Sequence, residues 1–251
     1  MATTLADTRA VTKTATALPG RRFDHYFFSG TAGLMLVCVL VGFGPTYYLA
    51  GVFNAPLPSR IIHVHGALFS CWMLMLIVQN SLASAGRVDI HKKLGLLGFG
   101  LACLMVIVGW VAATDRLVRG TAPPGVDTYF FYIVPMTDMV IFATLMFFAF
   151  RVRRDPSAHK RIIYIATMGI LLAAIARFHV SWLFHKAPHA AIASYFFLVL
   201  LIAYDLWSTH KIHRATLWAG GFLIFVQQIR LPIGKTAAWH SLAAGVQSFF
   251  R

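Results

Sequence analysis

The sequence predicts an all-α polytopic membrane protein with seven transmembrane helices. Of its 251 residues, 59% are hydrophobic and only 12% are charged, and the mean hydropathy is +0.71. A soluble domain carries about 25% charged residues, so this composition favours lipid as the solvent. The apolar residues also form long runs, and the basic residues gather between those runs.

Seven apolar runs are long enough to cross a bilayer, which takes about 20 residues of helix. Their expected ranges are Phe27 to Phe53, Ile61 to Ala85, Leu94 to Ala113, Tyr129 to Phe150, Arg161 to Phe184, Ala190 to Trp207 and Leu217 to Pro232. Residues 1–24 are polar and rich in Thr and Ala, which predicts a flexible cytoplasmic tail. Residues 25–251 are expected to form one seven-helix domain.

The basic residues predict the orientation. Fourteen Lys and Arg lie before the first run and in every second loop, whereas seven lie on the opposite side. The positive-inside rule therefore places the N-terminus in the cytoplasm and the C-terminus outside. This asymmetry accounts for the net charge of +14, so we expect the lipid bilayer and no nucleic acid as a partner.

Each of the three cytoplasmic turns is followed by a histidine and a basic residue: His91-Lys92, His159-Lys160 and His213-Arg214. These turns predict three helical hairpins packed behind the first helix. We expect the histidine–basic pairs to contact lipid phosphates. A ligand site on the cytoplasmic side is the alternative interpretation.

Glycine and proline predict interruptions in two helices. Gly42-Phe43-Gly44-Pro45 interrupts the first run, and Pro135 lies inside the fourth. A proline inside a helix frees a carbonyl and kinks the axis, and the freed group needs a partner within lipid. Both interruptions predict a lined cavity that opens outward.

Counting residues from the cytoplasmic turns, at about 1.5 Å each, places a group of polar side chains in one layer near the outer interface. The members of this layer are Tyr47, His63, His65, Arg177 and His179. Asp138 and Gln227 are expected to lie deeper. In the second run His65 shares a helical face with Phe69, Trp72 and Gln79, and this face should point into the bundle.

Asp138 is the residue that most needs an explanation, because all eight acids are Asp and this one lies inside an apolar run. A carboxylate at this depth costs about 2.5–3.5 kcal/mol on insertion scales, so it should be paired, protonated or bound to a metal. Arg177 is the expected partner. Asp205, near the cytoplasmic end of the sixth run, is expected to contact the interface.

Three functions remain open from these residues. The first is binding of b-type haem or quinone for electron transfer, with His65 and His179 as axial ligands, Arg177 or Arg230 near the propionates, and Tyr47 and Gln227 in the pocket. The second is a site for a single transition metal, formed by His63, His65, His179 and Asp138, in a membrane enzyme or transporter. The third is a structural or assembly subunit of a membrane complex, without catalysis and without a cofactor. No Walker loop, HExxH or GxSxG motif is present.

Several motifs resemble a family of uncharacterised bacterial multi-pass membrane proteins. They are His63-Val64-His65-Gly66-Ala67, Gln79, Gly86-Arg87, His91-Lys92-Lys93-Leu94-Gly95, Thr46-Tyr47-Tyr48, Arg154-Asp155-Pro156 and His159-Lys160-Arg161. The resemblance runs from the first to the fifth helix and implies an all-helical protein of the bacterial plasma membrane. The paired histidines are also loosely similar to those of b-type membrane cytochromes.

Overall fold

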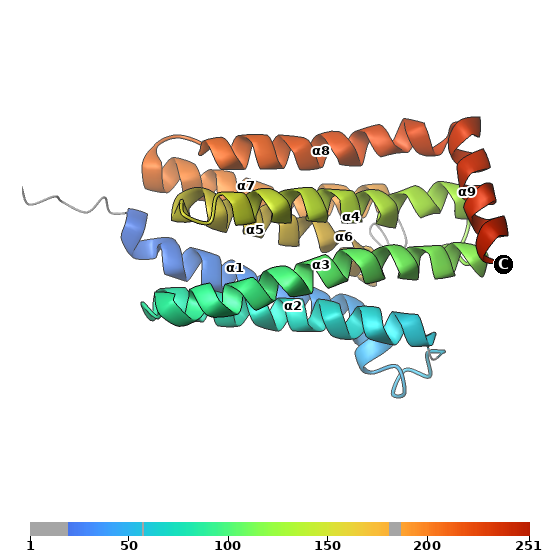
Figure 1. The fold of residues 1–251 in the computed structure, drawn as a ribbon, viewed down its shortest axis with the longest axis horizontal. Coiled ribbons are helices and arrows are strands. Elements are labelled where there is room, and N and C mark those ends of the chain that lie inside the picture. Colours follow the sequence, from blue (N-terminus) through green and yellow to red (C-terminus); the bar gives the residue numbers. More distant parts are fainter. Residues whose placement is uncertain (1–19, 57, 181–186) are drawn as a thin grey trace, which may run out of the picture.

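The computed structural model describes residues 20–56, 58–180 and 187–251, and the regular elements in these ranges are helices (Figure 1). Their bounds are α1 (Gly20–Phe43), η1 (Gly44–Tyr48), α2 (Arg60–Ser84), α3 (Val88–Val118), α4 (Thr128–Arg151), α5 (Pro156–Ile170), α6 (Leu172–Ile175), α7 (Ala187–Thr209), α8 (Arg214–Gly234) and α9 (Ala237–Phe250). The predicted tail, residues 1–24, falls mostly outside the described residues.

The long helices run side by side along one axis (Figure 1). The start of α1 and the turns α2–α3, α4–α5 and α7–α8 lie together at one end, which we call the basic end. The opposite end, with η1, α6 and α9, is called the far end. Neighbouring helices pack mainly as α2 on α3, α3 on α4 and α4 on α5, while α8 packs on α4 and α5 more than on α7.

Six helices of the described chain are long and apolar enough to cross a membrane: Phe23–Tyr48, Arg60–Ser84, Val88–Val118, Thr128–Arg151, Pro156–Ile175 and His189–Thr209. The prediction of an all-helical chain with several membrane-spanning helices is therefore supported. The seventh predicted run does form a helix, α8, but that helix falls outside this group. The segment contains Gln227, Gln228 and Arg230, which lower its apolar character.

The fifth predicted span is shorter than expected. The run was predicted to continue to Phe184, but α5 ends at Ile170 and α6 ends at Ile175. Here the backbone changes to the hydrogen bonds of a 3₁₀-helix. The amides of Leu171, Ala174 and Arg177 each donate to the carbonyl three residues earlier. Arg177 and His179 therefore follow the helix instead of lying within it. Residues 181–186 lie outside the described ranges.

The predicted interruption of the first helix is confirmed. At Gly44, α1 gives way to the single π-helical segment η1, with Pro45 near its start. The fourth helix, in contrast, is not interrupted at Pro135, because α4 continues through this residue. Gly42 also brings α1 against α6, since a Cβ atom there would overlap the backbone carbonyl of Ala174.

The interior of the bundle is filled by large apolar side chains. Met35, Met105 and Phe142 are almost completely inaccessible, and the indole of Trp72 lies edge-on to the Phe142 ring at 5.3 Å. The Trp72 indole also donates to Thr167 Oγ1 at 3.2 Å. The predicted inward face of the second helix is confirmed by these contacts.

A helix that the sequence did not predict, α9, turns across the far end of the bundle (Figure 1). Thr236 caps it by accepting from the amide of Trp239 at 3.2 Å. Gln247 ties it to α3 and α4, donating to the Leu117 carbonyl at 2.7 Å and accepting from Tyr129 at 3.0 Å. Leu242 and Phe249 remain exposed, as in an amphipathic helix that lies in a membrane interface.

The contact between α1 and α6 gives a stability prediction. Gly42→Ala should lower the free energy of unfolding by about 1–3 kcal/mol, because the added methyl meets backbone that has no room to move. Gly33→Ala, on the same helix, meets no atom within 4 Å and should be neutral or slightly stabilising. Equilibrium unfolding of the purified protein in mixed detergent measures both variants. Equal behaviour of the two would contradict the close contact.

Candidate functional site

The polar residues predicted to form one outward pocket fall into two groups on different helices. Tyr47, His63, His65 and Arg177 belong to η1, α2 and the segment after α6, whereas Asp138 and Arg230 belong to α4 and α8. Within the described ranges the backbones of α1 and α2 do not approach those of α4 and α8, although the Trp72 indole of α2 packs on Phe142 of α4. The residues expected around one outward-opening cavity therefore divide into two groups.

The first group, at the far end, is organised around Tyr47. Its hydroxyl donates to the His63 carbonyl at 3.2 Å. Its ring lies against Gly66, where a Cβ atom would come within 2.6 Å of the ring. The absence of a side chain at Gly66 therefore makes room for the Tyr47 ring.

His65 is the polar residue of this group that lacks a partner. Its ring packs on Phe69 at 4.1 Å, and its Nδ1 is buried without a hydrogen bond. His63, two residues earlier, is exposed. A polar atom buried without a partner costs about 1–3 kcal/mol, so the His65 nitrogen is free to bind a ligand that restores the lost bond.

Arg177 supplies positive charge beside His65. Its guanidinium lies 4.5 Å above the centre of the Phe43 ring and donates to the Ala173 carbonyl at 2.5 Å. It lies within electrostatic range of His65 and of Arg116 on α3. Neither arginine forms a salt bridge with a carboxylate among the described residues. We call His65, Tyr47, Arg177 and Arg116 the far-end site.

His179 is exposed in a bend four residues after α6 ends. The sequence placed it on a helix facing His65, and this placement is wrong because the helix ends at Ile175. Trp182, predicted to line the pocket, lies outside the described residues.

The second group is a buried ion pair. Arg230 Nη1 donates to Asp138 Oδ1 at 2.7 Å and lies 3.3 Å from Thr137 Oγ1. The two side chains are only 3% and 10% exposed, so the pair is sealed between α4 and α8. Asp138 was correctly predicted to be paired, but Arg177 as its partner is wrong. Counting residues along each helix predicts the depth of a side chain, but it does not predict which neighbouring helix the side chain faces.

Gln227 lies one helical turn before Arg230 and is also buried. Neither its amide nitrogen nor its oxygen has a hydrogen-bond partner, and Arg230 Nε has none either. Its neighbour Gln228 differs, since it donates to the Tyr195 hydroxyl at 3.2 Å. Buried water is the usual partner of such atoms in proteins.

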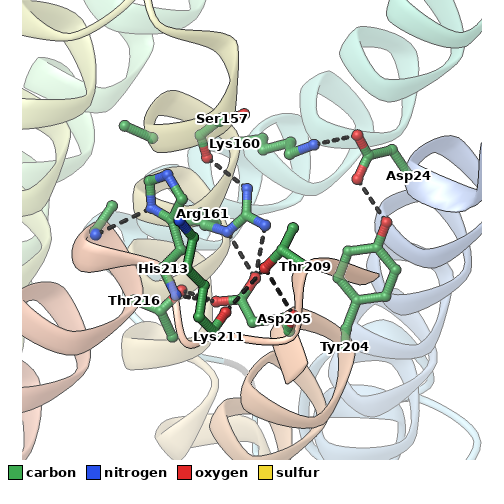
Figure 2. A network of polar contacts seen from close by, with 12 residues as sticks. Asp24, Ser157, Lys160, Arg161, Tyr204, Asp205, Thr209, Lys211, His213 and Thr216 are labelled. Carbon is green, nitrogen blue, oxygen red and sulfur yellow. Dashed lines mark hydrogen bonds and ion pairs between the residues drawn. The ribbon is translucent and has the colours of Figure 1, made fainter. Parts of the chain in front are cut away.

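A third polar group, at the basic end, was missed by the sequence analysis. Figure 2 shows Asp205 at its centre. One carboxylate oxygen accepts from Arg161 Nε and Nη2 at 2.8 and 2.6 Å. The other accepts from Thr216 Oγ1 at 2.6 Å and from the His213 amide at 3.0 Å. Asp205 is fully buried, so the prediction that it contacts the interface is wrong.

The rest of this network joins α1 to the same end (Figure 2). Asp24 pairs with Lys160 at 2.5 Å and accepts from the Tyr204 hydroxyl at 2.6 Å. The Tyr204 ring stacks on Phe27 at 4.1 Å. Burial and the nearby Arg161 charge lower the pKa of His213 below its ordinary value. This shift favours the neutral ring whose Nδ1 accepts from the Ala215 amide. Because both oxygens of Asp205 are satisfied, this group looks structural.

The four residues predicted to bind a single metal do not come together. Asp138 is engaged by Arg230 of α8, while His63 and His65 lie on α2, whose Trp72 packs on Phe142 of α4 and not on Asp138. Within the described ranges, no group of three or more His, Cys, Asp or Glu side chains is placed to hold a metal ion.

The buried pair of Asp138 and Arg230 gives a double-mutant prediction. Asp138→Leu alone or Arg230→Met alone should each cost about 3–5 kcal/mol of stability, because each strands a buried charge. The double variant should recover most of that loss. Arg119→Met breaks an exposed pair with Asp115 and should cost less than about 1 kcal/mol. Unfolding in mixed detergent measures all four proteins, and losses that simply add in the double variant would contradict the pairing.

Comparison with protein-family models, with curated proteins and with solved structures found no match to this chain. No relative therefore supplies a function for the far-end site or for the two ion pairs. The function has to be argued from the geometry of the described residues and from their chemistry.

Proposed function

We propose that this chain is a seven-span protein of a bacterial plasma membrane, with its basic end in the cytoplasm and its far end outside. The support for the orientation is the two-fold excess of Lys and Arg at the basic end. The amphipathic helix α9 would then lie in the outer interface.

The seventh span is α8. It runs alongside α4 over most of its length (Figure 1). Its polar residues Gln227 and Arg230 are turned into the protein and buried. Its opposite side exposes Leu217, Phe225 and Ile233, which suits contact with lipid. Two of the three residues that lower the hydropathy of the segment are therefore turned away from lipid, and the exposed third, Gln228, donates to the Tyr195 hydroxyl.

The number of spans can be tested by cysteine labelling. Cys38, Cys71 and Cys103 are replaced by Ser, and Lys211→Cys or Arg251→Cys is added. If α8 spans, a membrane-impermeant thiol reagent applied to intact spheroplasts should label residue 251 and leave residue 211 unlabelled until the membrane is opened. Labelling of both positions, or of neither, in intact spheroplasts would contradict a seventh span.

The far-end site supports binding of the head group of a membrane quinone, for electron transfer, as the function of the protein. The observation that carries this proposal is the Nδ1 of His65, which within the described ranges is buried without a partner beside an arginine that meets no carboxylate there. Quinone carbonyls accept hydrogen bonds, and reduction makes these oxygens more negative. A histidine and an arginine are donors suited to them.

Access from the membrane also favours a quinone. His63 is exposed, and Val64 beside it is half-exposed. A head group arriving from the lipid would thus meet the start of α2 and η1. Reduction to the quinol would take two electrons from a separate redox partner and two protons from water, while His65 would donate a hydrogen bond to a quinone oxygen.

Haem b fits these residues less well. It needs two axial ligands from opposite sides, and the second candidate, His179, lies in a bend outside the helix predicted to hold it. The face of α2 below His65 is occupied by Phe69 and by Trp72, which packs on Phe142. A macrocycle would have to displace these side chains.

Binding of a short-chain ubiquinone, measured by tryptophan quenching in detergent, tests the proposal. His65→Leu and Arg177→Met should each weaken binding about 10- to 100-fold, the usual effect of losing a hydrogen bond to a charged or polar ligand oxygen. His63→Leu, on the exposed side of the same helix, and Arg119→Met should bind normally. If the wild type does not bind, or all variants bind alike, the far-end site is not a quinone site. A structural or assembly subunit is then the better assignment.

A further inference from the structure

The basic end carries a second candidate site, formed by two of the histidines that follow its turns. His91 is the fourth residue of α3, and His159 is the fourth residue of α5. These two helices do not pack on each other, because α4 contacts both and separates them. Even so, the two imidazole rings approach to 6.5 Å between centres, at an angle of 86°.

The hydrogen bonds of the two rings determine which nitrogen is available. His159 Nδ1 lies 2.8 Å from the Ala149 carbonyl of α4, and His91 Nδ1 lies 3.3 Å from the Gln79 carbonyl of α2. A carbonyl oxygen only accepts, so each Nδ1 must carry the hydrogen. In the neutral ring, Nε2 then keeps its lone pair. Metal-binding histidines in proteins are oriented in this way.

Gln79 holds His91 in place from α2. Its amide nitrogen donates to the His91 carbonyl at 3.3 Å, its main-chain carbonyl accepts from His91 Nδ1, and the amide packs against Gly95. Its oxygen, Oε1, is buried without a partner among the described residues.

We propose that His91 and His159 bind one divalent transition-metal ion of the zinc, copper or nickel group. Two metal–nitrogen bonds of about 2.1 Å place the ring centres roughly 5 Å apart at a tetrahedral angle and roughly 6.5 Å apart in a linear arrangement. The observed 6.5 Å is the wide end of this range, so the rings approach by about 1 Å when a tetrahedral ion binds. Since only two histidines contribute, water fills the remaining positions.

The charges around the site favour a nitrogen-preferring metal over a hard cation. Lys92 and Lys93 follow His91 and are exposed, while the charge of Lys160 is neutralised by Asp24. No carboxylate contacts either ring among the described residues. Calcium and magnesium require oxygen ligands, so they are excluded by this donor set. A bound ion would join the start of α3 to the start of α5.

The experiment is a titration of the full chain, purified without a histidine tag, with Zn²⁺ alone in a calorimeter. We expect one ion per chain, and a loss of affinity of at least about tenfold in His91→Ala and in His159→Ala. His210→Asn is the matched control, because His210 is exposed in the α7–α8 turn at the same end. Absence of binding, unchanged binding in both alanine variants, or an equal loss in His210→Asn would overturn the proposal.

A second measurement does not depend on the variants. Bound to the wild-type protein, one equivalent of Cu²⁺ should show the paramagnetic resonance coupling of two imidazole nitrogens. Coupling to one nitrogen or to none would rule out the shared site, even if an alanine variant fails to fold. The result is independent of quinone binding, because the far-end site lies at the opposite end of the bundle.

Discussion

Two buried arginine–aspartate pairs hold the helices of this bundle in register. Asp138 and Arg230 join α4 to α8, and Arg161 and Asp205 join α5 to α7. Inside a membrane an unpaired charge costs several kcal/mol, whereas apolar surfaces attract one another only through packing. A shift of one helix by a single turn would separate both charges of a pair, so these contacts select one arrangement among many apolar alternatives.

Because Asp138 and Asp205 are paired with Arg230 and Arg161, they do not neutralise the other arginines. This bears on the positive charge of the far-end site. The chain has eight Asp and no Glu, against 22 Lys and Arg. Once Asp138 and Asp205 are engaged, Arg177 has no described carboxylate near it, and it rests on the Phe43 ring instead. An arginine held in this way keeps its charge and its free donors for a ligand. The acids at the same end are engaged by other groups, since Asp115 pairs with Arg119 and Asp127 caps α4.

The sequence predicted the helices well and the contacts between them poorly. Apolar runs and basic turns placed α2, α4 and α7 within a few residues, and Gly42 to Pro45 marked the end of α1 correctly. The end of α6 at Ile175 was missed, because the apolar run continues beyond it. Asp138 was recognised as buried, but its partner was wrong. Depth along a helix follows from residue counts, whereas rotation follows from packing with distant segments.

The features that could not be predicted from the sequence were missed for one physical reason. Asp205 looked interfacial because it lies near a helix end, yet Arg161 and Thr216 from two other helices enclose it. His91 and His159 are 68 residues apart, and only the fold shows that their rings meet across α4. Helix α9 has 14 residues and is too short to cross a bilayer, and its place against α3 and α4 follows from its packing there. In each case the signal lies in tertiary contacts.

The unsatisfied polar atoms show where the fold leaves room for ligands. At the basic end both oxygens of Asp205 are satisfied, and α1, α5, α7 and α8 are tied together there. In the outer half, His65 Nδ1, the Gln227 amide and Arg230 Nε are buried without partners. Buried polar atoms without partners are rare in folded proteins, since each costs about 1–3 kcal/mol. The satisfied Asp205 network maintains the helices, whereas the unpartnered atoms of His65 in the outer half and of Gln79 at the basic end mark places where the described residues leave room for water or a ligand.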